Sequence, residues 1–364
     1  MKRFFKAIAA ALALPLLLCC GCGIIPGQPD GDTETQNLKG FWRYTDTAMG
    51  TVIWQSIYAA GEDAAQKVSG EIMDYLDNLE QEKLSWRLDT SEVYKINASA
   101  GSPEGYQASE EMASLLRRCK ELYQQSDGAF DATLGPVVRL WNIDQWAAGG
   151  QTENFCPPSS QTLADALEKT GSDKLIIEET PSSSEQTIRT YVYIPQGTGI
   201  DLGAVGKGYA LAEIRNLLEQ NPEVTGAVIS VGGSVLTYGE KPDGSSWKVG
   251  ITDPFDTSAT IGVLSLRGEW CVSTSGDYER YMEADGVRYH HILNPATGYP
   301  ADSGVRSVTV LSKDGLLSDG LSTACFILGP EKGMELAVRY DAEVLFILDD
   351  GEVVMSEGME GYFQ

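Results

Sequence analysis

The chain has 364 residues, of which 27 are Lys or Arg and 52 are Asp or Glu, so its formal net charge is −25. Hydrophobic residues make up 42% of the chain, enough to bury a sizeable core, which excludes a disordered protein. The strong negative charge argues against a nucleic-acid partner, because contacts to phosphates need clustered Lys and Arg. Seven Cys are too few for a disulfide-stapled scaffold.

The N-terminus reads as an export signal. Lys2, Arg3 and Lys6 precede an apolar run over 7–18, which is short for a membrane span. The run ends at Gly21-Cys22, and a small residue followed by Cys is similar to the bacterial lipoprotein signal. We therefore expect a signal peptide over 1–22, lipidation of Cys22 and a location on the extracytoplasmic face of the cell membrane. Lipidation of Cys20, an ordinary cleaved signal or a membrane anchor are the alternatives.

Residues 23–40 are rich in Gly, Pro and polar residues, which is typical of a flexible tether. Loss of residues 1–21 would remove three positive charges and no acids, so the mature chain would carry −25 − 3 = −28. The four later cysteines show no paired spacing. Cys119 and Cys325 lie in apolar helical stretches, and we expect them to be core thiols.

Apolar residues recur at helical spacing in three stretches, which predicts helices over 63–83, 109–125 and 206–220. In the last helix, Leu211, Ile214, Leu217 and Leu218 should be buried. Residues 226–231, 305–311 and 343–348 are typical strands, and 144–160 and 180–186 read as loops. Strands and helices alternate irregularly. We expect one α+β domain over 41–360, a mixed sheet with flanking helices and an inserted subdomain.

The two histidines of the chain are neighbours, His290 and His291. Asn294, Pro295 and Gly298 follow them and indicate a tight turn, so the pair should lie where a strand enters a loop. Functional groups often occupy such places. A purely local role, with one His capping the turn and the other exposed, is the alternative.

The segment Asp201 to Gly208 reads DLGAVGKG and precedes a predicted helix. Glycines at a helix start let the backbone approach a ligand, and the helix N-terminus with Lys207 would favour an anion. The spacing is neither a P-loop nor a dinucleotide fingerprint. An ordinary turn into a helix is the alternative.

Residues 318–328 also read as a helix start, with Ser318 as N-cap and Asp319 as a first-turn acid. Asp319 and Thr323 are four residues apart and should share a helix face, where a carboxylate and a hydroxyl could ligate Mg²⁺. In the segment 128–136, Phe130 beside Asp131 could hold a planar ring and bind its polar edge, or simply connect a helix to a strand.

Several motifs occur together and in order. They are Met49-Gly50-Thr51, Gly128-Ala-Phe-Asp131-x-Thr133-x-Gly135-Pro136, Asp201-Leu-Gly-Ala204-x-x-Lys207-Gly, His291-Ile-x-x-Pro295-x-Thr297-Gly298 and Asp319-x-x-x-Thr323. Their order and spacing resemble the ApbE family of flavin transferases, which move FMN from FAD onto a protein. The resemblance covers about residues 41–360.

The resemblance implies that FAD contacts fall on Met49, Ala129, Phe130, Asp131, Asp201, Lys207 and Ile292, with Trp86 as the partner that stacks on the isoalloxazine ring. It implies Mg²⁺ ligands at Ala204, through its main-chain carbonyl, and at Asp319 and Thr323. Two features depart from the family pattern. Trp86 precedes its LDTSE segment by one extra residue, and Asn294 replaces the usual Asp, a change that the turn should tolerate.

The resemblance implies a Mg²⁺-dependent reaction in which a Ser or Thr of an acceptor protein attacks FAD and AMP leaves. His291, with an ordinary pKa near 6.5, and Asp319 are the two candidates for the general base. The acceptor is expected to be an extracytoplasmic redox subunit. Hydrolysis of FAD to FMN and AMP is an alternative reaction, and a flavin-binding lipoprotein without catalysis is an alternative of another class.

Overall fold

The computed structural model of the chain describes residues 40–149, 155–181 and 188–364. The predicted signal peptide with Cys22, and all of the predicted tether except its last residue, lie outside the described residues. Within the described part of the chain, no helix has both the length and the apolar character that crossing a bilayer requires.

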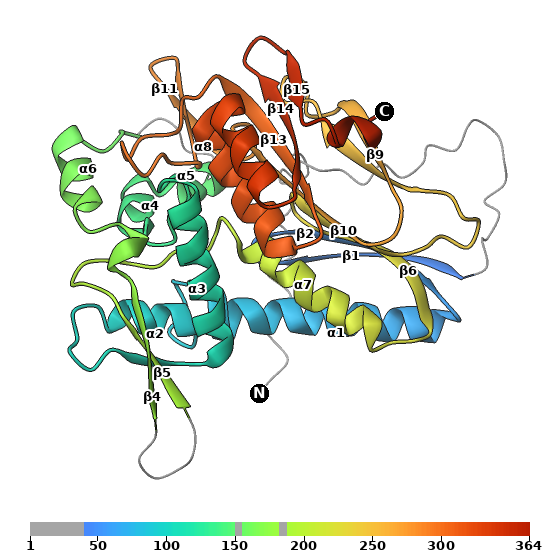
Figure 1. Cartoon of the computed structure of the whole chain (residues 1–364), viewed down its shortest axis with the longest axis horizontal. Helices are drawn as coiled ribbons and strands as arrows, with labels where there is room; N and C mark the ends of the chain where they lie inside the picture. The colour runs from blue at the N-terminus through green and yellow to red at the C-terminus, as the bar shows by residue number, and fades with distance from the viewer. Residues whose placement is uncertain (1–39, 150–154, 182–187) are drawn as a thin grey trace.

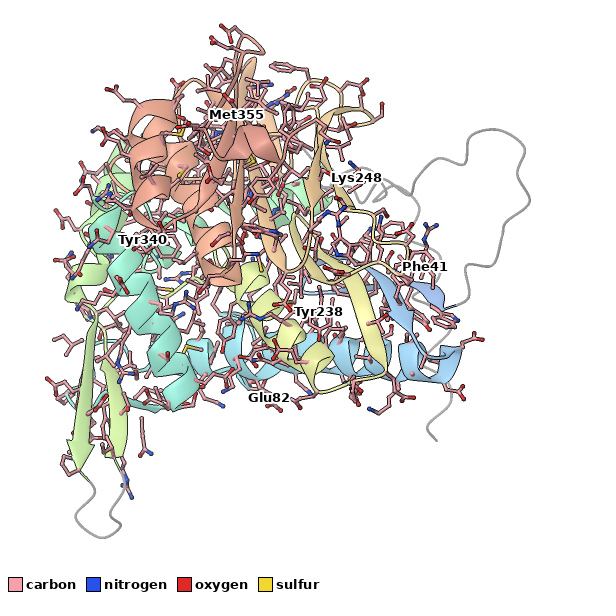
Figure 2. The ribbon with its side chains drawn as sticks, turned by 45° about the vertical axis from the view of Figure 1, so that its right-hand side comes forward. Phe41, Glu82, Tyr238, Lys248, Tyr340 and Met355 are labelled. Carbon is pink, nitrogen blue, oxygen red and sulfur yellow. The ribbon has the colours of Figure 1, made fainter. Side chains whose placement is uncertain are left out.

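An antiparallel sheet of eight strands forms the centre of the fold, in the order β1-β2-β6-β7-β10-β13-β14-β15 (Figure 1). The strands are Phe41–Ala48 (β1), Thr51–Ala59 (β2), Val224–Val231 (β6), Ser234–Gly239 (β7), Trp270–Gly276 (β10), Val305–Ser312 (β13), Glu343–Leu348 (β14) and Val353–Met355 (β15). The predicted strands at 226–231, 305–311 and 343–348 are confirmed as β6, β13 and β14. Figure 2 labels Phe41 and Met355, which lie on the two opposite edge strands.

Both faces of this sheet are buried, because successive side chains of a strand point to opposite faces. In β14, Val344 and Phe346 belong to a large core under the helices, whereas Leu345 and Ile347 belong to a second core. The hairpin of β8 (Trp247–Thr252) and β9 (Thr260–Leu266) supplies side chains to that second core. The sheet therefore lies between a helical layer and a β-hairpin layer.

The helical layer consists mainly of α1 (Glu62–Asn78), α3 (Glu110–Gln125), α7 (Gly206–Glu219) and α8 (Gly315–Arg339), which pack into the large core (Figure 1). The predicted helices at 63–83, 109–125 and 206–220 are confirmed, with α1 continuing as a π-helical segment over Leu79–Leu84. In α7, Leu211, Ile214 and Leu218 are buried as predicted, and Leu217 is half-buried.

Strands β2 and β6 are neighbours in the sheet, although residues 60–223 separate them in the chain. That stretch carries a small sheet of β3 (Tyr106–Ala108), β5 (Ile188–Tyr193) and β4 (Ile176–Pro181). It also carries α2 (Glu92–Ala98) and three further short helices, α4 (Gly135–Trp141), α5 (Ile143–Gly149) and α6 (Ser160–Leu167). The last three pack with β11 (Tyr281–Ala284) and β12 (Val287–His290) around a third core. The predicted α+β class with an inserted subdomain is confirmed.

The loop predicted over 144–160 is wrong at its start, because α5 occupies Ile143–Gly149. Glycines near 149 favoured a loop, but Ile143 and Trp146 pack into the third core and make this stretch helical. The loop predicted over 180–186 begins inside β4, which ends at Pro181, and the rest of it lies outside the described residues. The thiols of Cys119 and Cys325 are free and buried, as predicted, and burial raises the pKa of each to about 12.

Candidate functional site

Segments far apart in the sequence line one pocket beside α7 and α8. Every predicted site residue of the domain except Met49 contributes to its lining. Those that contribute are Trp86, Ala129, Phe130, Asp131, Asp201, Ala204, Lys207, His291, Ile292, Asp319 and Thr323. The pocket is thus built at the point where the predicted motifs converge.

Met49 lies next to the pocket rather than in its lining. It adopts a left-handed conformation with φ 52°, and its N–H donates to Glu80 at 3.1 Å. Its side chain packs beside Gly206, the first residue of α7. Met49 therefore supports the helix that carries Lys207, and its predicted contact with FAD stays a prediction.

The close packing of α7 against α8 depends on two glycines, Gly208 and Gly315. A Cβ added to Gly208 would lie 2.1 Å from the carbonyl oxygen of Gly315, and one added to Gly315 would lie 2.2 Å from that of Gly208. Glycine at both positions allows this approach because it has no side chain. The GKG sequence predicted as a helix start therefore also sets the distance between two helices.

Asp319 is buried, with 2% of its surface exposed, and lies where the two helices meet. Its Oδ2 accepts the N–H of Gly208 at 2.9 Å, and its Oδ1 accepts the hydroxyl of Ser234 at 3.3 Å. Nζ of Lys207 lies 3.5 Å from the same Oδ1. Asp319 therefore lies beside the start of α7, as a cation site shared with Ala204 requires, and it occupies one N–H of the α7 N-terminus.

The prediction that Ser318 caps the helix is wrong. Helix α8 begins at Gly315, and its N-cap is Asp314, whose carboxylate accepts the N–H of Leu317 at 3.1 Å. The hydroxyl of Ser318 instead donates to the carbonyl of Gly315 and contacts Ser273 at 2.8 Å. Asp319 therefore lies beyond the first turn of α8. Its side chain lines the pocket and does not act as a first-turn acid.

Thr323 shares the pocket-facing side of α8 with Asp319, as their spacing predicts. Its Oγ1 lies 3.3 Å from Oγ of Ser275 in β10. The described residues contain no group of three or more His, Cys, Asp or Glu arranged to hold a metal ion. A cation here would depend on the Asp319 carboxylate, the Thr323 hydroxyl and the Ala204 carbonyl. These are hard oxygen donors of the kind that Mg²⁺ accepts when substrate phosphates complete its shell.

The 131–135 segment runs beside the 199–201 segment. The N–H of Asp201 donates to the carbonyl of Ala132 at 2.8 Å, and the N–H of Gly135 donates to the carbonyl of Gly199 at 3.1 Å. Oδ1 of Asp201 accepts the N–H of Gly203 at 2.8 Å, which shapes the turn into α7. Burial raises the pKa of Asp201, although this hydrogen bond opposes the shift.

The carboxylate of Asp131 is already engaged within the protein. It accepts the N–H and the hydroxyl of Thr133 at 2.8 and 2.7 Å, the hydroxyl of Ser172 at 2.6 Å and the N–H of Gly171 at 3.0 Å. These bonds tie the turn that presents Ala129 and Phe130 to residues 171–172. The structure thus gives Asp131 a role in holding the pocket wall, and its predicted contact with FAD stays a prediction.

His290 is a buried structural residue. Its Nε2 lies 3.0 Å from the carbonyl of Ala301, and its Nδ1 lies 3.3 Å from the N–H of Ile292. These partners fit a neutral ring that donates from Nε2 and accepts at Nδ1. Burial lowers its pKa to about 4, and the carbonyl of Ala301 opposes the shift. His290 therefore fixes both ends of the loop that carries His291.

His291 follows β12, where the strand enters the loop, as predicted, and it faces the pocket. Its N–H and its Nδ1 both lie against the carbonyl of Arg280, at 3.0 and 3.3 Å. A ring that donates from Nδ1 has its lone pair on Nε2. Burial, followed by the nearby charge of Arg280, lowers the pKa of His291 well below 6.5. A neutral imidazole held in this way can accept a proton.

The replacement of Asp by Asn294 is tolerated by the turn. Its side-chain oxygen accepts the N–H of Ala296 at 2.9 Å, and its carbonyl accepts the N–H groups of Thr297 and Gly298. Asn provides the same acceptors as Asp for such a turn.

Trp86 lines the pocket with two guanidinium groups near its ring. Cζ of Arg87 lies 4.0 Å from the ring centroid, and Cζ of Arg139 lies 5.8 Å from it. Asp144 joins this side of the pocket to the opposite wall, because it accepts from Arg280 at 2.8 Å and lies 3.7 Å from Arg87. Sequence reasoning missed these charged residues, since nothing in their local pattern differs from a solvated loop.

Glu279 is a further pocket residue that the motifs did not indicate. Its Oε1 is shielded from solvent and has no hydrogen-bond partner among the described residues. Burial raises its pKa, and the ammonium of Lys207 opposes this shift.

Acidic groups outnumber basic groups in the pocket lining. The carboxylates are those of Asp131, Asp144, Asp201, Glu279 and Asp319, and the permanent cations are Arg87, Lys207 and Arg280. Such a lining repels an anionic ligand unless another cation joins it.

Comparison with known proteins shows the family to which the chain belongs. Residues 49–346 match the model of the ApbE family. A FAD:protein FMN transferase of Klebsiella pneumoniae is 35% identical over 318 residues, which cover 86% of this chain and 92% of that protein. One from Treponema pallidum is 31% identical and covers 94% and 93%.

Two solved structures share the fold. The ApbE protein of Thermotoga maritima superposes with a TM-score of 0.76 at 31% identity, covering 88% of this chain and 99% of that one. The flavinyl transferase ApbE of Pseudomonas stutzeri, in its apo form, superposes with a TM-score of 0.73 at 31% identity, covering 89% and 96%.

Proposed function

The chain belongs to the ApbE family, and we propose on this basis that it is a FAD:protein FMN transferase, which moves FMN from FAD to a Ser or Thr of an acceptor protein. The observation that carries the proposal is that residues from four of the five motifs line one pocket together with Trp86. The acceptor hydroxyl attacks the phosphorus on the FMN side of the pyrophosphate. Its oxygen forms the new P–O bond, and the bridging oxygen departs with AMP.

His291 is the better candidate for the general base. Its Nε2 carries the free lone pair, whereas both carboxylate oxygens of Asp319 already hold donors. In this proposal, Nε2 takes the proton of the attacking hydroxyl. Lys207 binds the phosphates from the start of α7, and Trp86 orients the isoalloxazine ring.

The proposal includes Mg²⁺, which would be held by Asp319, Thr323 and the carbonyl of Ala204. When bound, it would neutralise the pyrophosphate and stabilise the departing oxygen of AMP. The excess of carboxylates in the pocket lining supports this part of the proposal, because FAD is an anion and needs a local positive charge.

A mass measurement tests the function directly. A candidate acceptor is incubated with FAD, Mg²⁺ and the protein, and the intact mass of the acceptor is followed. An added FMN that disappears with Asp319→Asn supports the transferase. AMP release at an equal rate without acceptor would favour FAD hydrolysis, and bound flavin without any AMP would favour a flavin-binding protein.

We also propose a lipid anchor at Cys22 and a location on the extracytoplasmic face of the membrane, with the acceptor redox subunit on the same side. The sequence Gly21-Cys22 after an apolar run supports this proposal. Labelling of cells with a palmitate analogue should mark the wild-type protein and not Cys22→Ser. Equal labelling of both would contradict the anchor at Cys22.

A further inference from the structure

The pocket contains a carboxylate without a matching partner, that of Glu279. Its Oε1 is shielded from solvent and lacks a hydrogen-bond partner among the described residues. The cations near it are committed elsewhere, since Lys207 pairs with Asp319 and Arg280 pairs with Asp144. A buried polar atom without a hydrogen-bond partner costs free energy, so we expect a bound state in which Oε1 of Glu279 gains a partner.

Lys207 needs a second partner if Asp319 binds a cation. Its Nζ lies 3.5 Å from Oδ1 of Asp319. A cation bound to this carboxylate would have to lie close to the same ammonium. A divalent cation on Asp319 would repel this ammonium strongly in a buried setting. Lys207 has a long, flexible side chain that is 21% exposed, so it can turn away while its main chain stays in α7.

Glu279 is the pocket carboxylate best placed to receive Lys207. The oxygens of Asp131 are engaged by Thr133 and by residues 171–172. Asp144 is bound by Arg280, and Asp201 accepts the N–H of Gly203. Oε1 of Glu279 faces Gly233 at the β6–β7 turn, and the next residue, Ser234, donates to Asp319. The two carboxylates therefore lie beside two adjacent residues, Gly233 and Ser234, and the charge of Lys207 already acts on Glu279 by lowering its pKa.

We propose that Glu279 is a positioning residue of the cation site, which accepts the ammonium of Lys207 when a divalent cation occupies Asp319. The proposal rests on the proposed function, because it assumes a cation at Asp319. It gives a use to a pocket carboxylate whose Oε1 has no hydrogen-bond partner among the described residues. Glu279 acts through Lys207, whose ammonium has three donors and can bind the phosphates at the same time. Glu279 itself touches neither the cation nor the reacting phosphorus.

Binding of Mn²⁺ to the full chain without FAD tests this role apart from activity. Mn²⁺ prefers the same oxygen ligands as Mg²⁺, and its free concentration is measured by electron paramagnetic resonance. We expect Glu279→Gln to weaken Mn²⁺ binding about tenfold, since Lys207 then competes with the metal for Asp319. We expect Lys207→Met to remove this competition, so that adding Glu279→Gln to it changes the affinity less than twofold.

The controls separate the outcomes. An equal loss of affinity from Glu279→Gln with and without Lys207→Met would overturn the proposal and make Glu279 a direct ligand. Unchanged affinity in Glu279→Gln would overturn it as well, and the unfolding midpoint of each variant shows that it is folded. A wild-type protein that bound no Mn²⁺, or bound it as tightly as Asp319→Asn does, would contradict the proposed function and this inference with it.

Discussion

The α-carbon of Gly208 faces the carbonyl oxygen of Gly315 so closely that no side chain fits between α7 and α8. The N–H of Gly208 donates to Asp319 in the next turn of α8. The same contact therefore sets the separation of the two helices and the position of the carboxylate. Lys207 precedes Gly208 in α7, and Thr323 follows Asp319 in α8. A wider separation of the two helices would therefore displace both walls of the site.

Gly208→Ala should therefore damage stability and activity together. The added methyl group must push α7 away from α8, and overpacking of this kind costs about 2 kcal/mol of unfolding free energy. Displacement of Lys207 and Asp319 by a fraction of an ångström should lower FMN transfer at least about tenfold. Urea unfolding and the mass shift of an acceptor measure the two effects.

Gly70→Ala is the matched control, since Gly70 is exposed in the middle of α1 and a Cβ there would meet nothing within 4 Å. We expect it to stabilise the protein by about 0.5–1 kcal/mol and to leave transfer unchanged. Equal behaviour of the two variants would show that the close helix contact has no special role.

Asp319→Asn should lower FMN transfer about a thousandfold or more. The amide keeps the size of the carboxylate but loses the charge that a divalent cation needs, and metal catalysis contributes several kcal/mol.

Thr323→Ser should retain activity and Thr323→Val should lose it, because Ser keeps the hydroxyl oxygen. AMP release measures the rates. A Thr323→Val variant as active as the wild type would exclude this hydroxyl as a ligand.

His291→Asn should lower kcat by about 10²–10⁴, the usual contribution of a general base. In the wild type, burial and Arg280 lower the pKa of His291 well below 6.5, so the ring is neutral at pH 7. The rate should fall only when acid protonates the ring, so kcat/KM of the wild type should decline in an acid limb that lies well below pH 6.5. The variant should lack this limb. An unchanged acid limb in the variant would assign the base elsewhere.

His290 should make the stability of the protein depend on pH. Its folded pKa of about 4 lies below the unfolded value of 6.5, so its contribution is present above pH 6.5 and is lost as pH falls toward 4. Between pH 7 and pH 5, the wild type should lose about 2 kcal/mol more unfolding free energy than His290→Gln. Urea unfolding at the two pH values measures this difference. An equal loss of unfolding free energy in both proteins would show that His290 does not cause the pH dependence.

Removal of divalent cations should weaken FAD binding. With five carboxylates and three permanent cations in the pocket lining, the apo pocket repels a pyrophosphate. Quenching of flavin fluorescence, titrated with Mg²⁺ or with excess chelator, measures the two affinities. Tight binding of FAD in excess chelator would contradict the proposed site.

Most of the fold and most of the residues that line the pocket could be predicted from the sequence, but for two different reasons. Helices such as α3 and α7 bury one face each, so their apolar residues recur at helical spacing and are visible locally. The pocket residues belong to short motifs with fixed spacing, and their convergence follows from the family resemblance. The wrong N-cap at Ser318 shows the limit of local reasoning, because Asp314 also fits a cap and only tertiary packing decides between them.

Residues that act through charge alone were not visible in the sequence. Glu279, Arg280 and Asp144 are ordinary polar residues of turns and a short helix, and only the folded chain brings them together. The structural role of Asp131 was hidden for the same reason, since its partners at 171–172 lie far along the chain.

The order in which the pocket receives its parts has a consequence for the folding of the chain. Strand β6 must find β2 across residues 60–223, and Asp319 arrives still later, on the last long helix. Contacts between distant segments form slowly, because the chain loses the entropy of loop closure before these contacts stabilise it. A chain folding from its N-terminus therefore has no complete pocket until α8 docks, and fragments that end before Gly315 should be inert toward FAD.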